Sequence, residues 1–192
     1  CGGFSYGDVL GAGKGWSSSI NFSEKMQEQF LKFFEDEQKF TLGVCNGCQM
    51  ISSIKEIIPG AELWPSFSKN HSDQFEARLS QVKVLKSKSV LLKDMEDWCL
   101  PIIVSHGEGC ARFKNDEERN KLFESENICM AFADSSGYQT ELYPLNPNGS
   151  PSGVTGITNN TGNITIMMPH PERVFRSYQF SWKPPSWGEY SP

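Results

Sequence analysis

Apolar and polar positions alternate with two different periods along this chain, and the longer period predicts helices. Within residues 23–36, Met26, Phe30 and Phe34 recur at helical spacing among Glu, Lys and Gln. Ser23 stands where an N-cap is expected. We therefore expect an amphipathic helix of about four turns over these residues.

A second helix is predicted over residues 46–58, since Pro59 and Gly60 follow it directly. The shorter period of two residues, together with short apolar runs, predicts strands. The strand candidates are residues 40–44, 74–86, 101–105, 128–133, 153–158 and 163–168. Helices and strands interspersed in this way indicate an α/β protein.

Two segments are predicted to be loops. Residues 1–19 are rich in Gly and Ser, and residues 144–153 are rich in Pro, Asn and Gly. The second segment is too short to link separate domains. The predicted architecture is a three-layer α/β sandwich, in which helices flank a mostly parallel central sheet and the site lies at the C-terminal ends of strands.

Length and charge narrow the class of protein. A chain of 192 residues is long enough for one domain with a buried sheet. The net charge is -5 and the 18 basic residues are scattered, so we expect no nucleic-acid partner. The longest apolar runs, such as residues 100–104, are too short to cross a bilayer, so we expect no membrane partner.

Cysteine usage favours a reducing compartment. The chain begins with Cys1 and shows no signal-peptide pattern. A chain of this size with many strand-forming aliphatic residues does not need disulfide bonds, so we expect reduced thiols and a cytoplasmic protein. The six cysteines are at positions 1, 45, 48, 99, 110 and 129.

The most informative motif is a Gly-x-Cys-x-Gly sequence centred on Cys45. An apolar strand at residues 40–44 leads into it, and a predicted helix follows. This is the pattern of a nucleophile elbow with cysteine in place of serine. Gly43 and Gly47 allow a sharp turn, so we expect the thiol to stand exposed while the N–H groups of the helix N-terminus face it and favour the thiolate.

A second motif supplies a base and a group to orient it. The predicted strand at residues 163–168 leads into His170 and Glu172. Each motif alone is weak, because Gly, Cys, His and Glu are common in turns and on surfaces. Together they provide a nucleophile, a base and an orienting carboxylate, the set needed to form and hydrolyse a thioester.

These residues carry a family resemblance. The segments 43–49 and 169–173 resemble those of the class I (triad) glutamine amidotransferases. Segments 2–8, 72–78, 105–109 and 146–151 are similar to the glutaminase domain of the phosphoribosylformylglycinamidine synthase family, in its large single-polypeptide form. The resemblance covers nearly the whole chain. It implies that residues 1–192 form a glutaminase domain that is truncated at both ends.

The resemblance implies a role for each triad residue. Cys45 would attack the side-chain carboxamide of L-glutamine, release ammonia and form a γ-glutamyl thioester. His170 would take the thiol proton and pass it to the departing nitrogen, while Glu172 would orient the imidazole. The oxyanion would be bound by the N–H of Asn46, which follows the nucleophile, and by the loop that contains Gly3 and Phe4.

The resemblance also implies a glutamine pocket. Gln49 on the elbow helix would line it, together with Ser105, Gly107 and Glu108. His106 lies in the same loop and is either part of this pocket or a hydrogen-bonded structural histidine. Arg78 could pair with a carboxylate or brace an interface with a synthetase, and the sequence does not choose between the two.

Partners and cofactors follow from the same resemblance. A synthetase domain of the same polypeptide would use the ammonia, with ATP and Mg, to make formylglycinamidine ribonucleotide in purine biosynthesis. This domain itself is expected to need no cofactor and no metal. The Gly-rich residues 11–15 lack the spacing and the following Ser or Thr of a phosphate-binding P-loop.

Four other interpretations remain as alternatives. Cys45 and Cys48 form a C-x-x-C pair, which suggests thiol redox chemistry, but no cis-proline-like partner segment is evident. A zinc site would need two further paired ligands, and the other cysteines stand singly. The domain could also be a non-catalytic binding module, or it could serve another acceptor, as in GMP synthetase or anthranilate synthase.

Overall fold

The computed structural model describes residues 1–190; Ser191 and Pro192, the last two residues of the expected domain, lie outside the described residues. Its main sheet has six strands in the order β1-β8-β7-β6-β3-β4, and β2 pairs with β5 in a small second sheet. The strands are β1 (Thr41–Val44), β2 (Ser66–Ser68), β3 (Glu76–Val84), β4 (Cys99–His106), β5 (Cys110–Arg112), β6 (Ile128–Phe132), β7 (Val154–Thr158) and β8 (Ile164–Met167).

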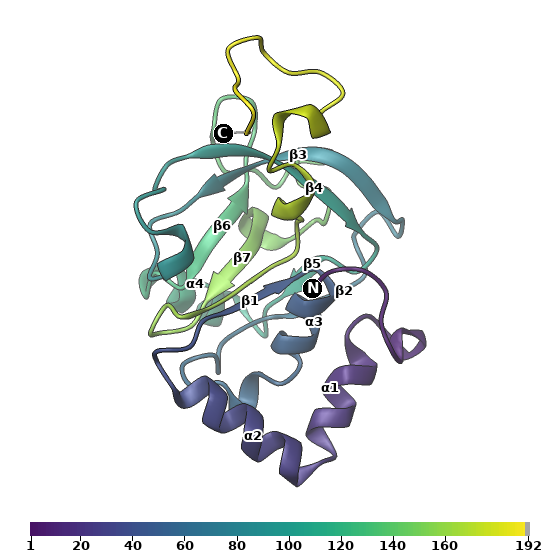
Figure 1. Ribbon diagram of the computed structural model, residues 1–192, viewed down its shortest axis with the longest axis vertical. Helices are drawn as coiled ribbons and strands as arrows, with labels where there is room; N and C mark the ends of the chain where they lie inside the picture. Colours follow the sequence, from purple (N-terminus) through teal and green to yellow (C-terminus); the bar gives the residue numbers. More distant parts are fainter. Residues whose placement is uncertain (191–192) are drawn as a thin grey trace.

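Helices α1, α2 and α3 gather on one side of the sheet, and α3 packs on β1 and β8 (Figure 1). The α-helices are α1 (Lys14–Asn21), α2 (Glu24–Glu35), α3 (Asn46–Ser52) and α4 (Asp116–Glu124). Short 3-10 turns cover Asp8–Leu10, Lys55–Ile57, Val90–Leu92, Pro151–Gly153, Pro171–Arg173 and Ser177–Gln179. Within residues 1–190, no helix is both long and apolar enough to span a membrane.

The α/β class is confirmed, but the sheet is mixed and not mostly parallel. Only β1 and β8 run parallel among the described pairs, while the other four pairs of the main sheet are antiparallel. The connection between β7 and β8 shows why. This connection consists only of residues 159–163. Such a length is enough for a tight turn between antiparallel strands but too short for the crossover that connects parallel neighbours.

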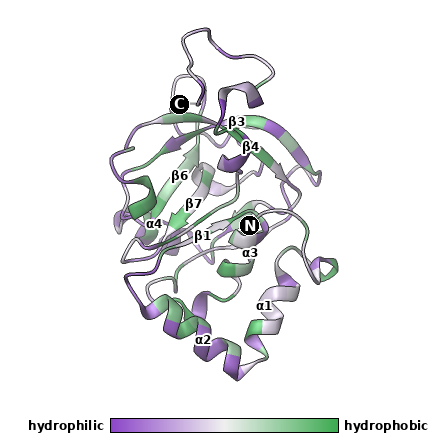
Figure 2. Cartoon of the chain, in the orientation of Figure 1, coloured by the Kyte–Doolittle hydropathy of each residue, from purple (hydrophilic) through white to green (hydrophobic). Residues whose placement is uncertain are grey.

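All six predicted strands are present within a few residues of their expected bounds. The central strands β6 and β7 are buried at every position, and Figure 2 shows green, hydrophobic residues along β6 and in part of β7. The helix predicted over residues 23–36 is α2, and the Ser23 side chain accepts a hydrogen bond from the Met26 N–H at 3.4 Å, as an N-cap should.

The helix predicted over residues 46–58 is wrong in its second half. α3 ends at Ser52, and residues 55–57 form a separate 3-10 turn. The Ser53 hydroxyl donates to the carbonyl of Gln49 at 2.7 Å and the Ser52 hydroxyl to that of Pro65, which directs the chain away from the helix axis.

The loop predicted over residues 1–19 is also partly wrong, because α1 begins at Lys14. Its sequence contains Gly and three Ser, which have modest helix propensity. Tertiary packing forms it instead: Ser17 and Ile20 are buried, and α1 contacts both α2 and α3. Helix α4 and the short strands β2 and β5 were likewise not predicted from the sequence.

Candidate active site

Cys45 lies at the sharp turn between β1 and α3, as the elbow motif predicts. Its backbone has φ 53° and ψ -109°, a conformation that residues other than glycine rarely adopt. The turn is held because the Cys45 N–H donates to Met167 O at 2.9 Å. Gly43 permits it, since a Cβ there would lie 2.7 Å from Ile51 Cδ1 and 3.0 Å from Ile166 Cγ2.

The predicted exposure of the Cys45 thiol is wrong: only 6% of the residue is exposed, because the surrounding segments cover it. Its Sγ lies 3.9 Å from the carbonyl oxygen of Ser105. Burial raises the pKa of this thiol above its ordinary value. Hydrogen bonds from the backbone N–H groups of Gly3 and Asn46, and the positive charge of Arg173, act in the opposite direction. The expected preference for the thiolate is therefore not found, because desolvation outweighs these donors.

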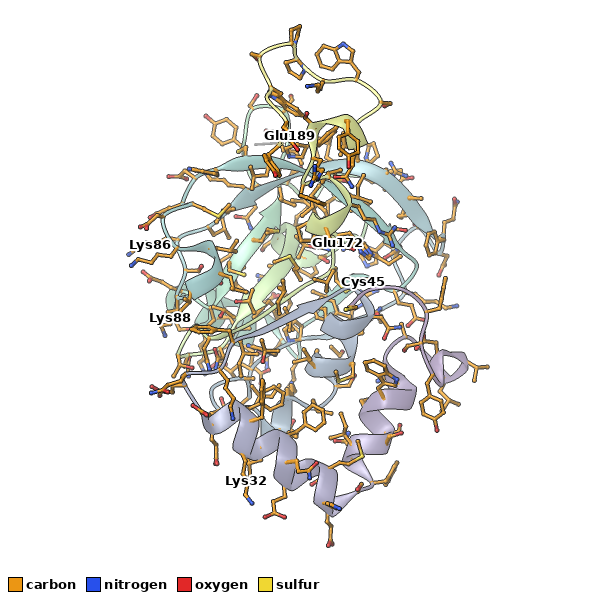
Figure 3. The ribbon with its side chains drawn as sticks, in the orientation of Figure 1. Lys32, Cys45, Lys86, Lys88, Glu172 and Glu189 are labelled. Atoms are coloured by element: carbon orange, nitrogen blue, oxygen red, sulfur yellow. The ribbon has the colours of Figure 1, made fainter. Side chains whose placement is uncertain are left out.

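His170 follows β8 and is fully buried. Its backbone N–H donates to Ile103 O at 2.8 Å, and its Nδ1 lies 2.7 Å from Glu172 Oε1. Its Nε2 has no hydrogen-bond partner within residues 1–190. Figure 3 shows Glu172 and Cys45 in the same part of the molecule.

Gly2 brings the two motifs into one place. A Cβ on Gly2 would lie 2.3 Å from His170 Cε1 and 3.2 Å from Cys45 Cβ. The chain therefore passes directly over both side chains, and only glycine fits. The resemblance had placed the neighbouring Gly3 and Phe4 at the site, and both lie there.

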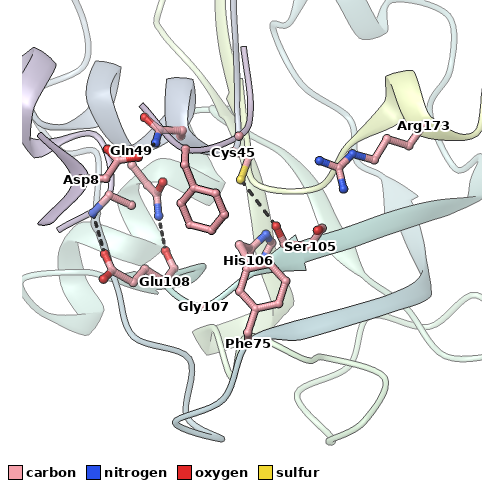
Figure 4. Close-up of a pocket in the computed structure, with 13 residues that line it drawn as sticks. Asp8, Cys45, Gln49, Phe75, Ser105, His106, Gly107, Glu108 and Arg173 are labelled. Atoms are coloured by element: carbon pink, nitrogen blue, oxygen red, sulfur yellow. Dashed lines mark hydrogen bonds between the residues drawn. The ribbon is translucent and has the colours of Figure 1, made fainter. Parts of the chain in front are cut away.

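A pocket of about 300 Å³ opens beside Cys45 (Figure 4). It brings together every residue predicted for the oxyanion hole and the glutamine pocket. His170 and Glu172 are not part of its lining. The lining residues are Gly3, Phe4, Asp8, Ala12, Cys45, Asn46, Gln49, Phe75, Ser105, His106, Gly107, Glu108 and Arg173.

Two of these side chains bridge separate segments of the chain. Gln49 Nε2 on α3 donates to Glu108 O at 2.7 Å. The Glu108 carboxylate accepts the N–H of Ala12 at 3.0 Å, and Figure 4 shows both contacts. The Gly-rich loop therefore directs an N–H group at a carboxylate of its own chain.

Asp8 is a pocket residue that the sequence analysis did not assign. Its carboxylate accepts from the side chain of Asn46 at 2.7 Å, from the Ser5 hydroxyl at 3.1 Å and from the Gly13 N–H at 3.2 Å. It thus ties the N-terminal loop to the elbow. The only signal was its place in the segment 2–8 that resembles the synthase family.

Phe75 and Arg173 were also missed, although each belongs to a segment that the resemblance covered. His106 fits both of its predicted descriptions, because it lines the pocket and its Nε2 bonds to Asn148 Oδ1 at 2.7 Å. Arg78 does not line the pocket. It pairs with Glu76 and lies over the ring of Tyr143, 5.1 Å from the centroid.

The cysteines other than Cys45 and the acidic side chains do not form a disulfide or a metal site within residues 1–190. Cys48 is fully buried, as expected for the packed side of the elbow helix, and burial raises the pKa of its thiol. All six cysteines are free thiols. Within residues 1–190, no cluster of three or more His, Cys, Asp or Glu side chains could hold a metal ion.

Known proteins resemble this chain in sequence and in fold. A family described as CobB/CobQ-like glutamine amidotransferase domain matches residues 1–192. PurLQS from Thermotoga maritima superposes with a TM-score of 0.65 at 23% identity, over 93% of this chain and 69% of that one. A glutamine amidotransferase from the same organism superposes with a TM-score of 0.46 at 17% identity, over 88% of this chain and 53% of that one.

Proposed function

Since this chain belongs to the CobB/CobQ-like glutamine amidotransferase domains, we propose that its pocket binds L-glutamine and that Cys45 is the nucleophile. The observation that carries this proposal is the meeting of two distant motifs. Gly2 lies against both the Cys45 side chain and the His170 ring, and the pocket opens at the thiol. Nucleophile, base and substrate cavity are then in one place.

In the first step, the Cys45 sulfur attacks the carboxamide carbon and its proton passes to His170 Nε2. This nitrogen suits the role, because Nδ1 is already bonded to Glu172 and Nε2 is left without a partner in the described chain. The Glu172 carboxylate fixes the orientation of the ring and stabilises the imidazolium that forms. His170 then protonates the nitrogen, the C–N bond breaks, and ammonia leaves.

The oxyanion of the tetrahedral intermediate is bound by the N–H groups of Gly3 and Asn46. Both already donate toward the Cys45 sulfur, which supports the assignment, since an oxyanion on the attacked carbon would lie close to that atom. Phe4 continues the same loop at the pocket wall. Removal of one such donor typically lowers kcat by about 10²–10³.

In the second step, water hydrolyses the γ-glutamyl thioester. His170 removes a proton from the water as the new C–O bond forms, then returns it to the sulfur as the C–S bond breaks, which regenerates Cys45 and releases glutamate. Gln49, Ser105, Gly107 and Glu108 hold the amino-acid end of the substrate. The Glu108 carboxylate has acceptor capacity beyond its bond to Ala12 and would take the α-ammonium group.

The acceptor of the ammonia is proposed from the two resemblances. Segments outside the triad motifs are similar to the phosphoribosylformylglycinamidine synthase family, and PurLQS has the same fold. The ammonia would then serve a synthetase domain that uses ATP and Mg to make formylglycinamidine ribonucleotide. The Ala12 and Gly13 N–H groups already donate to the carboxylates of Glu108 and Asp8, so residues 11–15 do not present these groups to a phosphate.

The test is chemical labelling combined with product analysis. The intact protein should convert glutamine to glutamate and ammonia, and a glutamine-mimicking diazoketone should modify Cys45 alone among the six cysteines. Peptide mapping identifies the labelled thiol. Label on Cys48, or release of glutamate by a Cys45→Ala variant, would contradict the proposed nucleophile.

A further inference from the structure

The segment 105–109 forms one wall of the pocket, and its backbone contacts two residues of the elbow. The Ser105 carbonyl lies 3.9 Å from Cys45 Sγ, and the Glu108 carbonyl accepts from Gln49 Nε2 at 2.7 Å. Residues 105 and 106 end β4 and pair with β3, whereas residues 107–109 join β4 to β5 without regular secondary structure. The conformation of residues 107–109 must therefore be set by something other than a strand ladder.

Asn70 holds this segment from one side. The residue is 2% exposed, its Nδ2 donates to His106 O at 2.8 Å, and its Oδ1 accepts from the Gly109 N–H at 2.9 Å. Its own backbone N–H donates to Gly107 O at 2.9 Å. Asn70 thus satisfies three backbone groups of the segment.

Asn148 holds the segment from the other side. It is fully buried, its Nδ2 donates to Gly109 O at 2.9 Å, and its Oδ1 lies 2.7 Å from His106 Nε2. Because Nδ2 is the donor, Oδ1 must accept, and His106 Nε2 carries its proton. Burial lowers the pKa of His106 to about 4, so the ring is neutral at neutral pH.

We propose that Asn70 and Asn148 are positioning residues for substrate binding, which act through the segment 105–109. Neither lines the pocket, so neither touches the substrate. Each amide offers a donor to a carbonyl and an acceptor to an N–H, which a carboxylate cannot do. An Asp would place an oxygen against the carbonyl of His106 or Gly109 and displace the pocket wall. The inference rests on the proposed function, since the substrate is glutamine.

The test compares two reagents on Asn70→Asp and Asn148→Asp variants of the intact protein. The diazoketone needs the glutamine pocket, whereas iodoacetamide needs only the thiol. The second-order rate constant for diazoketone labelling of Cys45 should fall at least tenfold, and KM for glutamine should rise by a similar factor. Iodoacetamide labelling should change less than threefold. Asn148→Ser, which keeps a hydroxyl donor, should give a smaller effect.

Asn159→Asp is the matched control. Asn159 is 1% exposed, donates to Pro59 O at 3.3 Å and accepts from the Ile164 N–H at 3.1 Å, at the end of β8 away from His170. It should lower stability without changing KM. Equal loss of diazoketone labelling in this control would overturn the proposal, as would failure of both Asn148 variants to fold while the control folds. No labelling of the parent protein would refute the proposed function instead.

Discussion

The Cys45 backbone has φ 53°, a strained conformation for a residue with a side chain. This conformation fixes the position of the sulfur relative to the groups around it. In this position the sulfur lies close to the two N–H donors and to the Ser105 carbonyl, but in an environment that raises its pKa. A thiol with a raised pKa needs a base at the moment of attack. The buried imidazole of His170 is therefore more important here than a preformed thiolate would be.

Substitutions of the triad should separate the base from its orienting group. His170→Ala removes the only proposed proton acceptor, so we expect kcat for glutamine hydrolysis to fall by roughly five orders of magnitude. Glu172→Gln keeps a hydrogen-bonding side chain beside Nδ1, so the fall should be smaller, roughly three orders. Steady-state glutamate release measures both. Equal losses would mean that Glu172 does more than orient the ring.

The pH dependence of Cys45 alkylation should reveal the opposing effects of burial and charge. Because the pKa of the thiol is raised, its iodoacetamide reaction should keep increasing with pH beyond about 8.5, the value of an ordinary thiol. Arg173→Gln removes a positive charge that lowers this pKa, so the profile should move to still higher pH. Arg119→Gln on α4 is the control and should leave it unchanged. A shift to lower pH in Arg173→Gln would contradict the assigned effect.

At the scale of secondary-structure elements, the close contact between β1 and α3 depends on the absence of a side chain at Gly43. A Cβ on Gly43 would lie 2.7 Å from Ile51 Cδ1 and 3.1 Å from the Gly47 carbonyl. Helix and strand could then no longer approach as they do. Glycine at position 43 is thus needed for the packing of α3 on β1 as well as for the turn that carries Cys45.

Gly43→Ala should lower the free energy of unfolding by about 1–3 kcal/mol, as overpacking of a close contact typically does. Urea denaturation measures the change. Gly188→Ala is the matched control, because a Cβ there meets nothing within 4 Å. A difference of less than about 0.5 kcal/mol between the two variants would show that the junction relaxes easily.

At the scale of the whole molecule, the production of ammonia can be measured separately from its proposed use by a synthetase domain. In the intact protein, Cys45→Ala should abolish glutamine-dependent synthesis of formylglycinamidine ribonucleotide and leave synthesis from ammonium salts largely intact. The reason is that the thioester needs Cys45, whereas the proposed synthetase domain would use ammonia without it. Product formation from each nitrogen donor is the measurement. Loss of both activities in a folded variant would contradict this division of labour.

The features that the sequence predicted are those set by neighbours along the chain. Residues 40–47 form a strand, a sharp turn and the start of a helix because an apolar run and two glycines leave few alternatives. The amphipathic helix α2 and its Ser23 cap are local for the same reason. The triad motifs were recognisable because each stands at the end of such a predicted strand.

The tertiary structure decided what depends on segments far apart. α1 forms through packing although its own residues favour a helix only weakly. The mixed sheet follows from how the strands pair, and the pocket roles of Asp8, Phe75 and Arg173 arise from three separate segments. The raised pKa of Cys45 depends on burial, and the positioning of segment 105–109 by Asn70 and Asn148 depends on hydrogen bonds across the fold. No local pattern encodes these, because they exist only once distant residues have been brought into contact.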